Sequence, residues 1–87
     1  MAYTVYILRT SKNTLYIGQT NNLDKRLADH AAKNQHSAKY LKYFDSFQLE
    51  YSETQPTLSA ALKRERELKS WSKDKKEKLI KAAAQVL

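Results

Sequence analysis

An acidic residue interrupts the apolar face of a predicted helix in the last third of the chain. At about 100° per residue, four apolar residues of the helix that follows Thr57 fall on one stripe: Leu58, Ala61, Leu62 and Leu68. Glu65 falls about 20° from Leu58, inside that stripe, whereas Glu67 falls on the opposite, solvated face. A buried carboxylate is costly unless a cation lies beside it. Glu65 is therefore either half of a structural ion pair with a buried Arg or Lys, or a metal-binding or catalytic carboxylate in a cleft.

Arg26 and His30 could form a phosphate-binding pair in an earlier helix. They are four residues apart, which places them on one helix face, at the rim of the stripe of Leu23, Leu27 and Ala31. Arginine offers a planar fork of donors that stays charged, and histidine can exchange a proton near neutral pH. Ordinary surface positions would explain the same pattern.

Tyr6 and Tyr16 could supply two phenol groups to the same site. If the loop between their strands holds three residues, "SKN", the two side chains lie on one sheet face as diagonal neighbours, whereas a two-residue loop would separate them. They could also be ordinary strand tyrosines with wet hydroxyls. Gly18, predicted to end the second strand, either breaks that strand or lets a ligand approach the backbone.

The elements that would position these groups can be read from periodicity and turn chemistry. Two strands with a short turn between them predict a β-hairpin, and a strand that alternates apolar Phe47, Leu49 and Tyr51 with polar residues follows later. The predicted strands are Tyr3–Arg9, Thr14–Gly18 and Phe47–Glu53. The first two predicted helices are Leu23 to about Lys33 and Ala38–Phe44. A third helix begins after Pro56 with Thr57 as its cap, and a fourth lies within Ser72–Leu87. The order β-β-α-(α)-β-α-α predicts an α+β fold, a small, mainly antiparallel three-stranded sheet flanked by helices, in one domain over residues 1–87.

The composition of the chain indicates where in the cell the protein is expected and what kind of molecule it binds. The chain has 87 residues, no cysteine and a formal charge of +7. No apolar run approaches the roughly 20 residues of a membrane span, and no signal peptide is evident, so we expect a cytoplasmic protein without a membrane partner. The basic excess favours a polyanion, with nucleic acid ahead of an anionic membrane surface, although a merely solubilising surface would also carry it.

Taken together, these residues resemble the GIY-YIG nuclease superfamily, and most closely its small stand-alone bacterial members. "TVYIL" at Thr4–Leu8 stands where that family has its GIY segment. "LYIGQTNNLDKRLADH" at Leu15–His30 is similar to its YIG segment with the following arginine and histidine, and "ALKRERELKSW" at Ala61–Trp71 is similar to its glutamate helix. The resemblance spans nearly the whole chain.

The resemblance implies a metal-dependent endonuclease that hydrolyses phosphodiester bonds in DNA, with RNA not excluded. It makes Tyr6 and Tyr16 the paired tyrosines, Arg26 the catalytic arginine, His30 the nearby histidine and Glu65 the ligand of Mg²⁺ or Mn²⁺. Either tyrosine would take a proton from water, and Arg26 and His30 could lower the pKa of a phenol from about 10. No motif reads bases, so we expect weakly specific or structure-selective cutting, in a repair or recombination setting, by a monomer or weak dimer.

Further basic and aromatic residues could contact nucleic acid, and two departures from the family pattern leave an alternative open. Phosphate contacts are expected from the basic residues Lys39, Lys42, Lys63, Lys69 and Lys73, and close backbone approach at Gly18. Tyr40, Tyr43 and Trp71 could stack on bases or belong to the core. Thr4 replaces the first family glycine, and no asparagine follows Glu65. The missing asparagine and the charge of +7 make a nucleic-acid-binding module that lacks catalysis or needs a partner the alternative, with a protein-interaction adaptor behind it.

Overall fold

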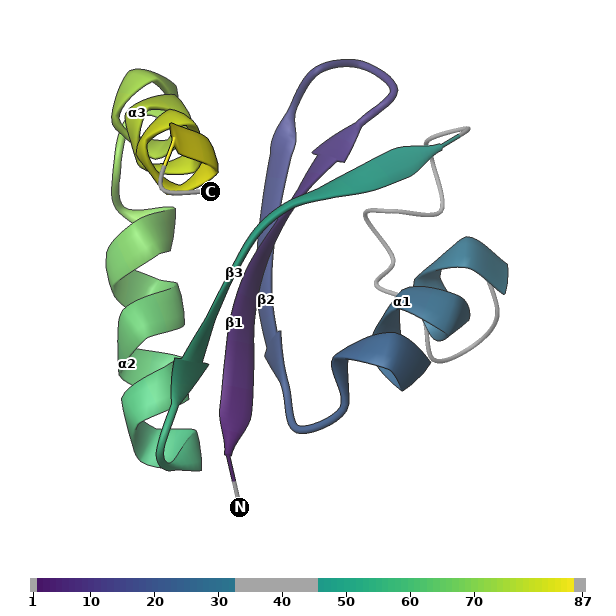
Figure 1. Ribbon diagram of the computed structural model, residues 1–87, viewed down its shortest axis with the longest axis vertical. Helices are drawn as coiled ribbons and strands as arrows, with labels where there is room; N and C mark the ends of the chain where they lie inside the picture. The colour runs from purple at the N-terminus through teal and green to yellow at the C-terminus, as the bar shows by residue number, and fades with distance from the viewer. Residues whose placement is uncertain (1, 33–45, 86–87) are drawn as a thin grey trace.

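The structure is a computed structural model that describes residues 2–32 and 46–85 (Figure 1). Its elements are β1 (Tyr3–Thr10), β2 (Leu15–Thr20), α1 (Leu23–Ala32), β3 (Phe47–Gln55), α2 (Leu58–Lys69) and α3 (Lys73–Gln85). The predicted α+β class and three-stranded antiparallel sheet are confirmed. The helix predicted over Ala38–Phe44 lies outside the described residues. Within the described ranges, no helix is long and apolar enough to cross a membrane.

A three-residue turn sets the register of the β1–β2 hairpin. The amide of Asn13 donates to the carbonyl of Thr10, and the amide of Thr10 donates to the carbonyl of Thr14, each at 2.9 Å. Asn13 has a φ of 62°, the left-handed residue that completes a three-residue hairpin loop. The register pairs Leu8 with Tyr16 and Tyr6 with Gly18. Tyr6 and Tyr16 therefore lie on one face as diagonal neighbours, as the odd loop length predicts.

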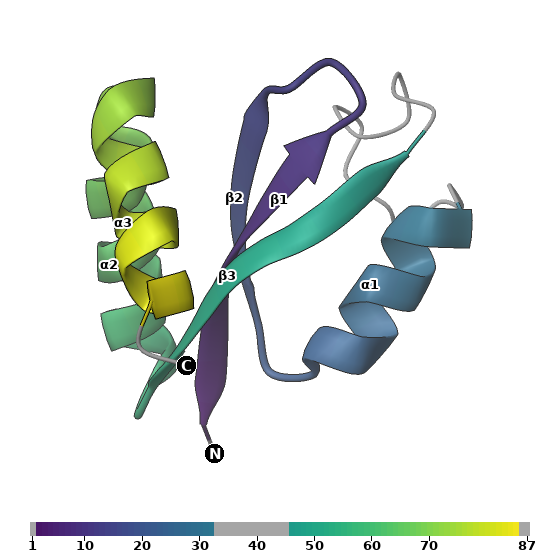
Figure 2. The same cartoon turned by 45° about the horizontal axis from the view of Figure 1, so that its top comes forward.

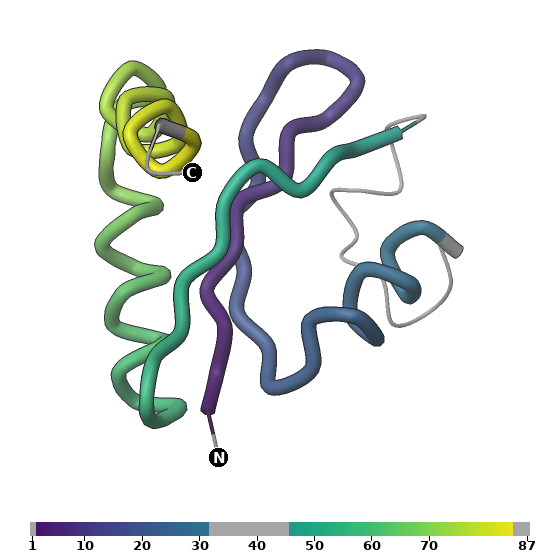
Figure 3. The backbone as a smooth tube through the Cα atoms, in the orientation of Figure 1, coloured from purple at the N-terminus to yellow at the C-terminus, as the bar shows by residue number. Residues whose placement is uncertain are grey.

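The sheet has the order β2-β1-β3 and is covered on both faces. Figures 1 and 2 show α1 on one side of it and α2 with α3 on the other, and the tube in Figure 3 shows the strands twisting across one another. Alternation along β1 divides the core accordingly. Val5 and Ile7 pack with Ala61, Leu68 and Ile80 under α2 and α3. On the other face Tyr6 and Leu8 pack with Tyr16, Leu23, Leu27 and Phe47 under α1.

A bulge in β3 corrects the predicted alternation of that strand. Leu8 pairs with Leu49 and Ile7 pairs with Tyr51, which leaves Glu50 as an extra residue. Phe47 consequently packs on the α1 face and Tyr51 on the α2–α3 face, and Leu49 is 43% exposed. The prediction that Phe47, Leu49 and Tyr51 share one buried face was wrong because one inserted residue reverses a period of two.

Each helix begins at a capping side chain. Asn22, Thr57 and Ser72 each accept a hydrogen bond from the amide three residues later, at 3.1, 3.1 and 3.2 Å. Such caps satisfy amides that the first turn of a helix leaves unpaired. The predicted cap at Thr57 is confirmed.

The rotation of α1 and α2 about their axes differs from the helical-wheel prediction. In α1, Ala31 is exposed and His30 is fully buried, so the inward stripe is Leu23, Leu27 and His30. In α2 the buried residues are Ala61 and Leu68, whereas Leu58 and Leu62 are 43% and 40% exposed. The wheel identifies neighbours on a helix, but the sheet decides which of them face inward.

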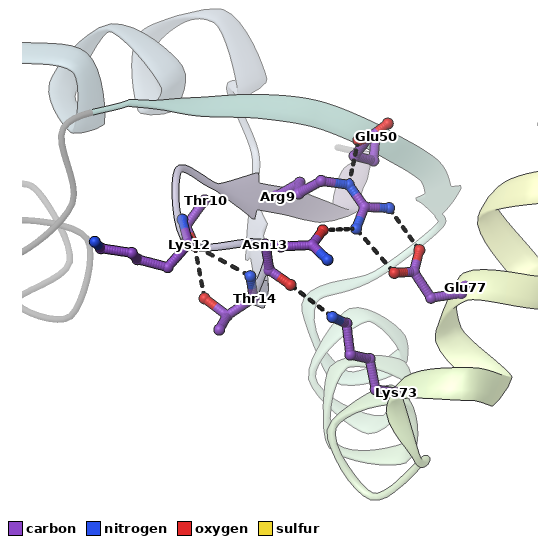
Figure 4. Close-up of polar contacts among 8 residues, drawn as sticks. All are labelled: Arg9, Thr10, Lys12, Asn13, Thr14, Glu50, Lys73 and Glu77. Atoms are coloured by element: carbon purple, nitrogen blue, oxygen red, sulfur yellow. Dashed lines mark hydrogen bonds and ion pairs between the residues drawn. The ribbon is translucent and has the colours of Figure 1, made fainter.

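A polar cluster ties the start of α3 to the hairpin and β3 (Figure 4). The Arg9 guanidinium donates to both carboxylate oxygens of Glu77, at 2.8 and 2.5 Å, to Glu50 at 2.6 Å and to the Asn13 side chain at 2.6 Å. The Lys73 ammonium donates to the Asn13 carbonyl at 2.7 Å. Because Arg9 stands between two carboxylates, its pKa is raised and that of Glu77 is lowered. The cluster holds three segments distant in sequence in a fixed arrangement.

Candidate active site

Three aromatic side chains meet between the sheet and α1. Tyr6 is 1% exposed and His30 is fully buried, and the Tyr6 hydroxyl lies 3.1 Å from Nε2 of His30. The ring centroids of Tyr16 and His30 are 5.8 Å apart in an edge-on arrangement, and those of Tyr6 and Tyr16 are 6.4 Å apart. Phe47 also packs edge-on against the imidazole, with the ring centroids 6.0 Å apart. The packing leaves Tyr6 and His30 fixed relative to one another.

Gly18 stands directly opposite Tyr6 and makes room for its ring. A Cβ atom at Gly18 would lie 2.5 Å from the Tyr6 hydroxyl oxygen and 2.7 Å from Cζ, closer than side chains tolerate. β2 also continues past Gly18 to Thr20, so the prediction that this glycine ends the strand was wrong. The sequence left two roles for Gly18, to break the strand or to let a ligand approach the backbone. The structure contains a close approach, but the approaching group is the Tyr6 ring of the same chain.

The residues around the Tyr6 hydroxyl have opposing effects on its pKa. Burial raises the pKa of Tyr6 to about 12, and the nearby Tyr16 and the Glu65 carboxylate act in the same direction. Arg26 acts against them, through a hydrogen bond and through its charge. Of the two tyrosines whose pKa positive neighbours were expected to lower, Tyr6 shows the opposite shift, because loss of water outweighs the guanidinium.

His30 is a neutral imidazole at physiological pH. Burial lowers its pKa to about 4, and the charge of Arg26 lowers it further, with Asp29 opposing. His30 therefore adds no positive charge beside Tyr6. With its proton on Nδ1 it can accept the Tyr6 hydrogen bond at Nε2.

Glu65 lies in the helical layer on the other face of the sheet (Figure 1) and acts on this group through its charge. It belongs to α2, which packs mainly on β2 and β1, and its charge still acts on the Tyr6 hydroxyl. Its carboxylate lies 3.4 Å from the ammonium of Lys69, one turn along the helix. The Glu65 side chain is 18% exposed and that of Lys69 is 57% exposed, so this partner is a surface lysine and not the buried cation of a structural pair. Glu67 is exposed and pairs with Arg64, as its place on the wheel predicts.

The donor set limits how a metal could be held. Among residues 2–32 and 46–85, no group of three His, Asp or Glu side chains could surround an ion. A single carboxylate at Glu65 fits Mg²⁺ or Mn²⁺ only if substrate phosphates and water complete the shell, which is a common mode of Mg²⁺ binding. The residues present therefore fit a metal that binds together with its substrate.

Arg26 lies half-buried between two shallow hollows at the start of α1. One hollow is bounded by the turn that caps α1 and by Lys25 and Asp29. The other, of about 380 Å³, is lined by Tyr3, Gln19, Thr20, Asn21, Arg26 and Leu58. Asn22 fixes the first turn of α1, so the backbone of Arg26 is held in place beside β2. The sequence predictions included neither Leu58 nor Gln19 in this site; an exposed leucine cannot be recognised from helical periodicity.

The remaining predicted contact residues are distributed over the α2–α3 layer. Lys63, Lys69 and Lys73 are exposed, whereas Lys39 and Lys42 lie outside the described residues, as do Tyr40 and Tyr43. The Trp71 ring packs against the core, with Lys75 4.2 Å and Arg64 5.3 Å from its centroid. Two cations therefore lie against Trp71, which favours its core interpretation over base stacking.

The fold and the residues around Tyr6 together indicate the family of proteins to which the chain belongs. Residues 2–78 match the family model described as the GIY-YIG catalytic domain, and the chain belongs to that family.

Its relatives include small proteins from bacteria and archaea. It is 41% identical over 76 residues to a UPF0213 protein of Natronomonas pharaonis, covering 87% of each chain. It is 42% identical to a UPF0213 protein of Staphylococcus saprophyticus, covering 87% of this chain and 90% of that one. The solution NMR structure of a UPF0213 protein from Bacillus halodurans superposes with a TM-score of 0.60 at 33% identity, covering 94% of this chain and 85% of that one.

Proposed function

We propose that this protein is a divalent-metal-dependent endonuclease that hydrolyses phosphodiester bonds in DNA. The observation that carries the proposal is that His30, at 3.1 Å, and Arg26 both hydrogen-bond the hydroxyl of Tyr6, whose pKa the charge of Glu65 also affects. Tyr6, Arg26 and His30 come from the first 30 residues of the chain, and Glu65 comes from α2. Ordinary core packing does not require a guanidinium and an imidazole to share one phenol.

The proposed roles follow from charge and geometry. Arg26 binds the phosphoryl oxygens, where its planar donors match a phosphate and offset charge that develops during the reaction. Tyr6, as the phenolate that Arg26 favours, accepts the proton of the attacking water, and His30 holds the hydroxyl in place at 3.1 Å without taking a proton, since burial lowers its pKa to about 4. Glu65 would hold the metal in place of its contact with Lys69. When bound, Mg²⁺ or Mn²⁺ supplies positive charge that polarises the phosphate and offsets the unfavourable effect of Glu65 on the Tyr6 phenolate.

The positive charge of the helical layer supports a nucleic-acid substrate. α2 and α3 together contain nine Lys and Arg against four Asp and Glu, which is most of the excess charge of the chain. Such a field attracts a polyanion without reading its sequence, so binding should weaken steeply as salt concentration rises.

The test compares two glutamates of the same helix. Purified protein is incubated with flap, junction and plasmid DNA in Mg²⁺, Mn²⁺ or EDTA. We expect Glu65→Gln and Arg26→Ala to reduce cleavage by about 100-fold or more, and the exposed Glu67→Gln to cleave like the wild type. Cleavage that survives both substitutions would refute the proposal. Salt-sensitive binding with no cleavage in any metal would instead identify a binding module.

A further inference from the structure

Two exposed leucines extend the Glu65 face of α2 toward Arg26. Leu58 and Leu62 are 43% and 40% exposed and lie one turn apart. With Glu65 and Lys69 they form one stripe along the helix, since residues three and four apart are neighbours on a helix surface. Single exposed leucines are common, but an adjacent pair that continues a candidate metal site is an apolar surface next to reacting groups.

Leu58 also lines the hollow that contains Arg26. The starts of α1 and α2 lie at the same end of the sheet (Figure 2), and the end of β2 passes between them. The hollow has an aromatic and an aliphatic wall from Tyr3 and Leu58, amide groups from Gln19 and Asn21, and the guanidinium of Arg26. It is an open hollow of about 380 Å³, so one face of a group bound there would stay in contact with water.

The chemistry of this hollow matches a nucleoside better than other ligands. A flat base presents an apolar face to Tyr3 and Leu58 and a polar edge to the amides. No carboxylate is among the residues described as lining it, whereas Asp29 lines the neighbouring hollow that Arg26 also borders, so an attached phosphate would meet Arg26 from the side without a carboxylate. An intact duplex could offer only its backbone here, because its bases are stacked and paired.

We infer that the hollow bounded by Tyr3, Gln19, Arg26 and Leu58 binds the base of the nucleotide next to the scissile phosphate. The inference rests on the proposed function for its position relative to the chemistry. If the hollow binds a base, tight binding requires an unpaired nucleotide at that position. Leu58 then contributes to substrate selection through an apolar contact with the base, which a charged residue cannot make.

The experiment measures binding without catalysis, in EDTA, by fluorescence anisotropy. The probes are a labelled single-stranded oligodeoxynucleotide, the same strand with abasic sites throughout, and the corresponding duplex. Leu58→Ser is compared with Leu49→Ser, which removes an equally exposed leucine from β3, and circular dichroism verifies that both variants fold. We expect Leu58→Ser to weaken binding of the intact single strand by about fivefold, the loss of roughly one apolar contact. Binding of the abasic strand and the duplex should be unchanged, and Leu49→Ser should bind like the wild type.

Two results would overturn the inference: no effect of Leu58→Ser, or equal weakening for all three probes. Because no metal is present, the outcome is independent of the cleavage assay. A protein that cuts DNA but shows no Leu58 dependence retains the proposed function and loses the subsite. A protein that never cuts but shows the base-dependent loss retains the subsite and loses the nuclease activity.

Discussion

The contact between Gly18 and Tyr6 gives a sharp prediction about stability. In Gly18→Ala the new methyl would lie 2.7 Å from Cζ of Tyr6, roughly 1 Å short of the 3.5–4.0 Å of a favourable carbon–carbon contact. The ring is buried and must move about that far, which would break its 3.1 Å hydrogen bond to His30. Overpacking costs about 1–3 kcal/mol and leaving a buried polar group unpaired about 1–3 kcal/mol. We expect a loss of roughly 2–6 kcal/mol in the free energy of unfolding, the sum of these two costs.

Urea denaturation followed by Trp71 fluorescence measures this loss, and a second background tests its cause. In Tyr6→Val the ring is absent, so adding Gly18→Ala should cost nothing or stabilise by about 0.5–1 kcal/mol, because alanine loses less backbone entropy on folding. The coupling energy of the double-mutant cycle should then be at least about 2 kcal/mol. An equal cost of Gly18→Ala in both backgrounds would show that the Tyr6 ring does not lie over Gly18.

Two further predictions concern buried charge and the polar cluster at α3. The unfolded chain protonates His30 below its ordinary pKa of 6.5, whereas the folded protein does not until about pH 4, so the wild type should lose up to about 3 kcal/mol of stability as pH falls between these values. His30→Gln cannot titrate, and thermal unfolding across pH 4–7 should show a shallower loss; coincident slopes would contradict the burial of a neutral histidine. Glu77→Gln removes one of two carboxylates from Arg9 and, after allowance for solvent screening, should cost about 1 kcal/mol by urea denaturation, and less at high salt. Glu67→Gln is the matched control, and an equal effect of the two would mean that the Arg9 cluster contributes no more than a surface pair.

Local patterns in the sequence were sufficient for the fold. The β-branched and aromatic runs, the cap at Thr57 and the period of α2 depend on interactions within a few residues, which a sequence displays directly. For the tyrosines the sequence left two arrangements, one for each loop length, and the observed three-residue loop selects the one in which Tyr6 and Tyr16 share a face. The separation of Glu65 from Glu67 follows from helical geometry alone.

Tertiary packing decided what those patterns leave open. A helical wheel gives the relative positions of Leu58, Leu62 and Glu65 but not the rotation of α2 against the sheet, and that rotation exposes both leucines beside the candidate site. The bulge at Glu50, the burial of His30 and the approach of Tyr6 to Gly18 each depend on segments distant in the chain. The pKa of Tyr6 is raised for the same reason. The hydroxyl loses water because residues from several segments pack around it, and no short stretch of sequence contains all of them.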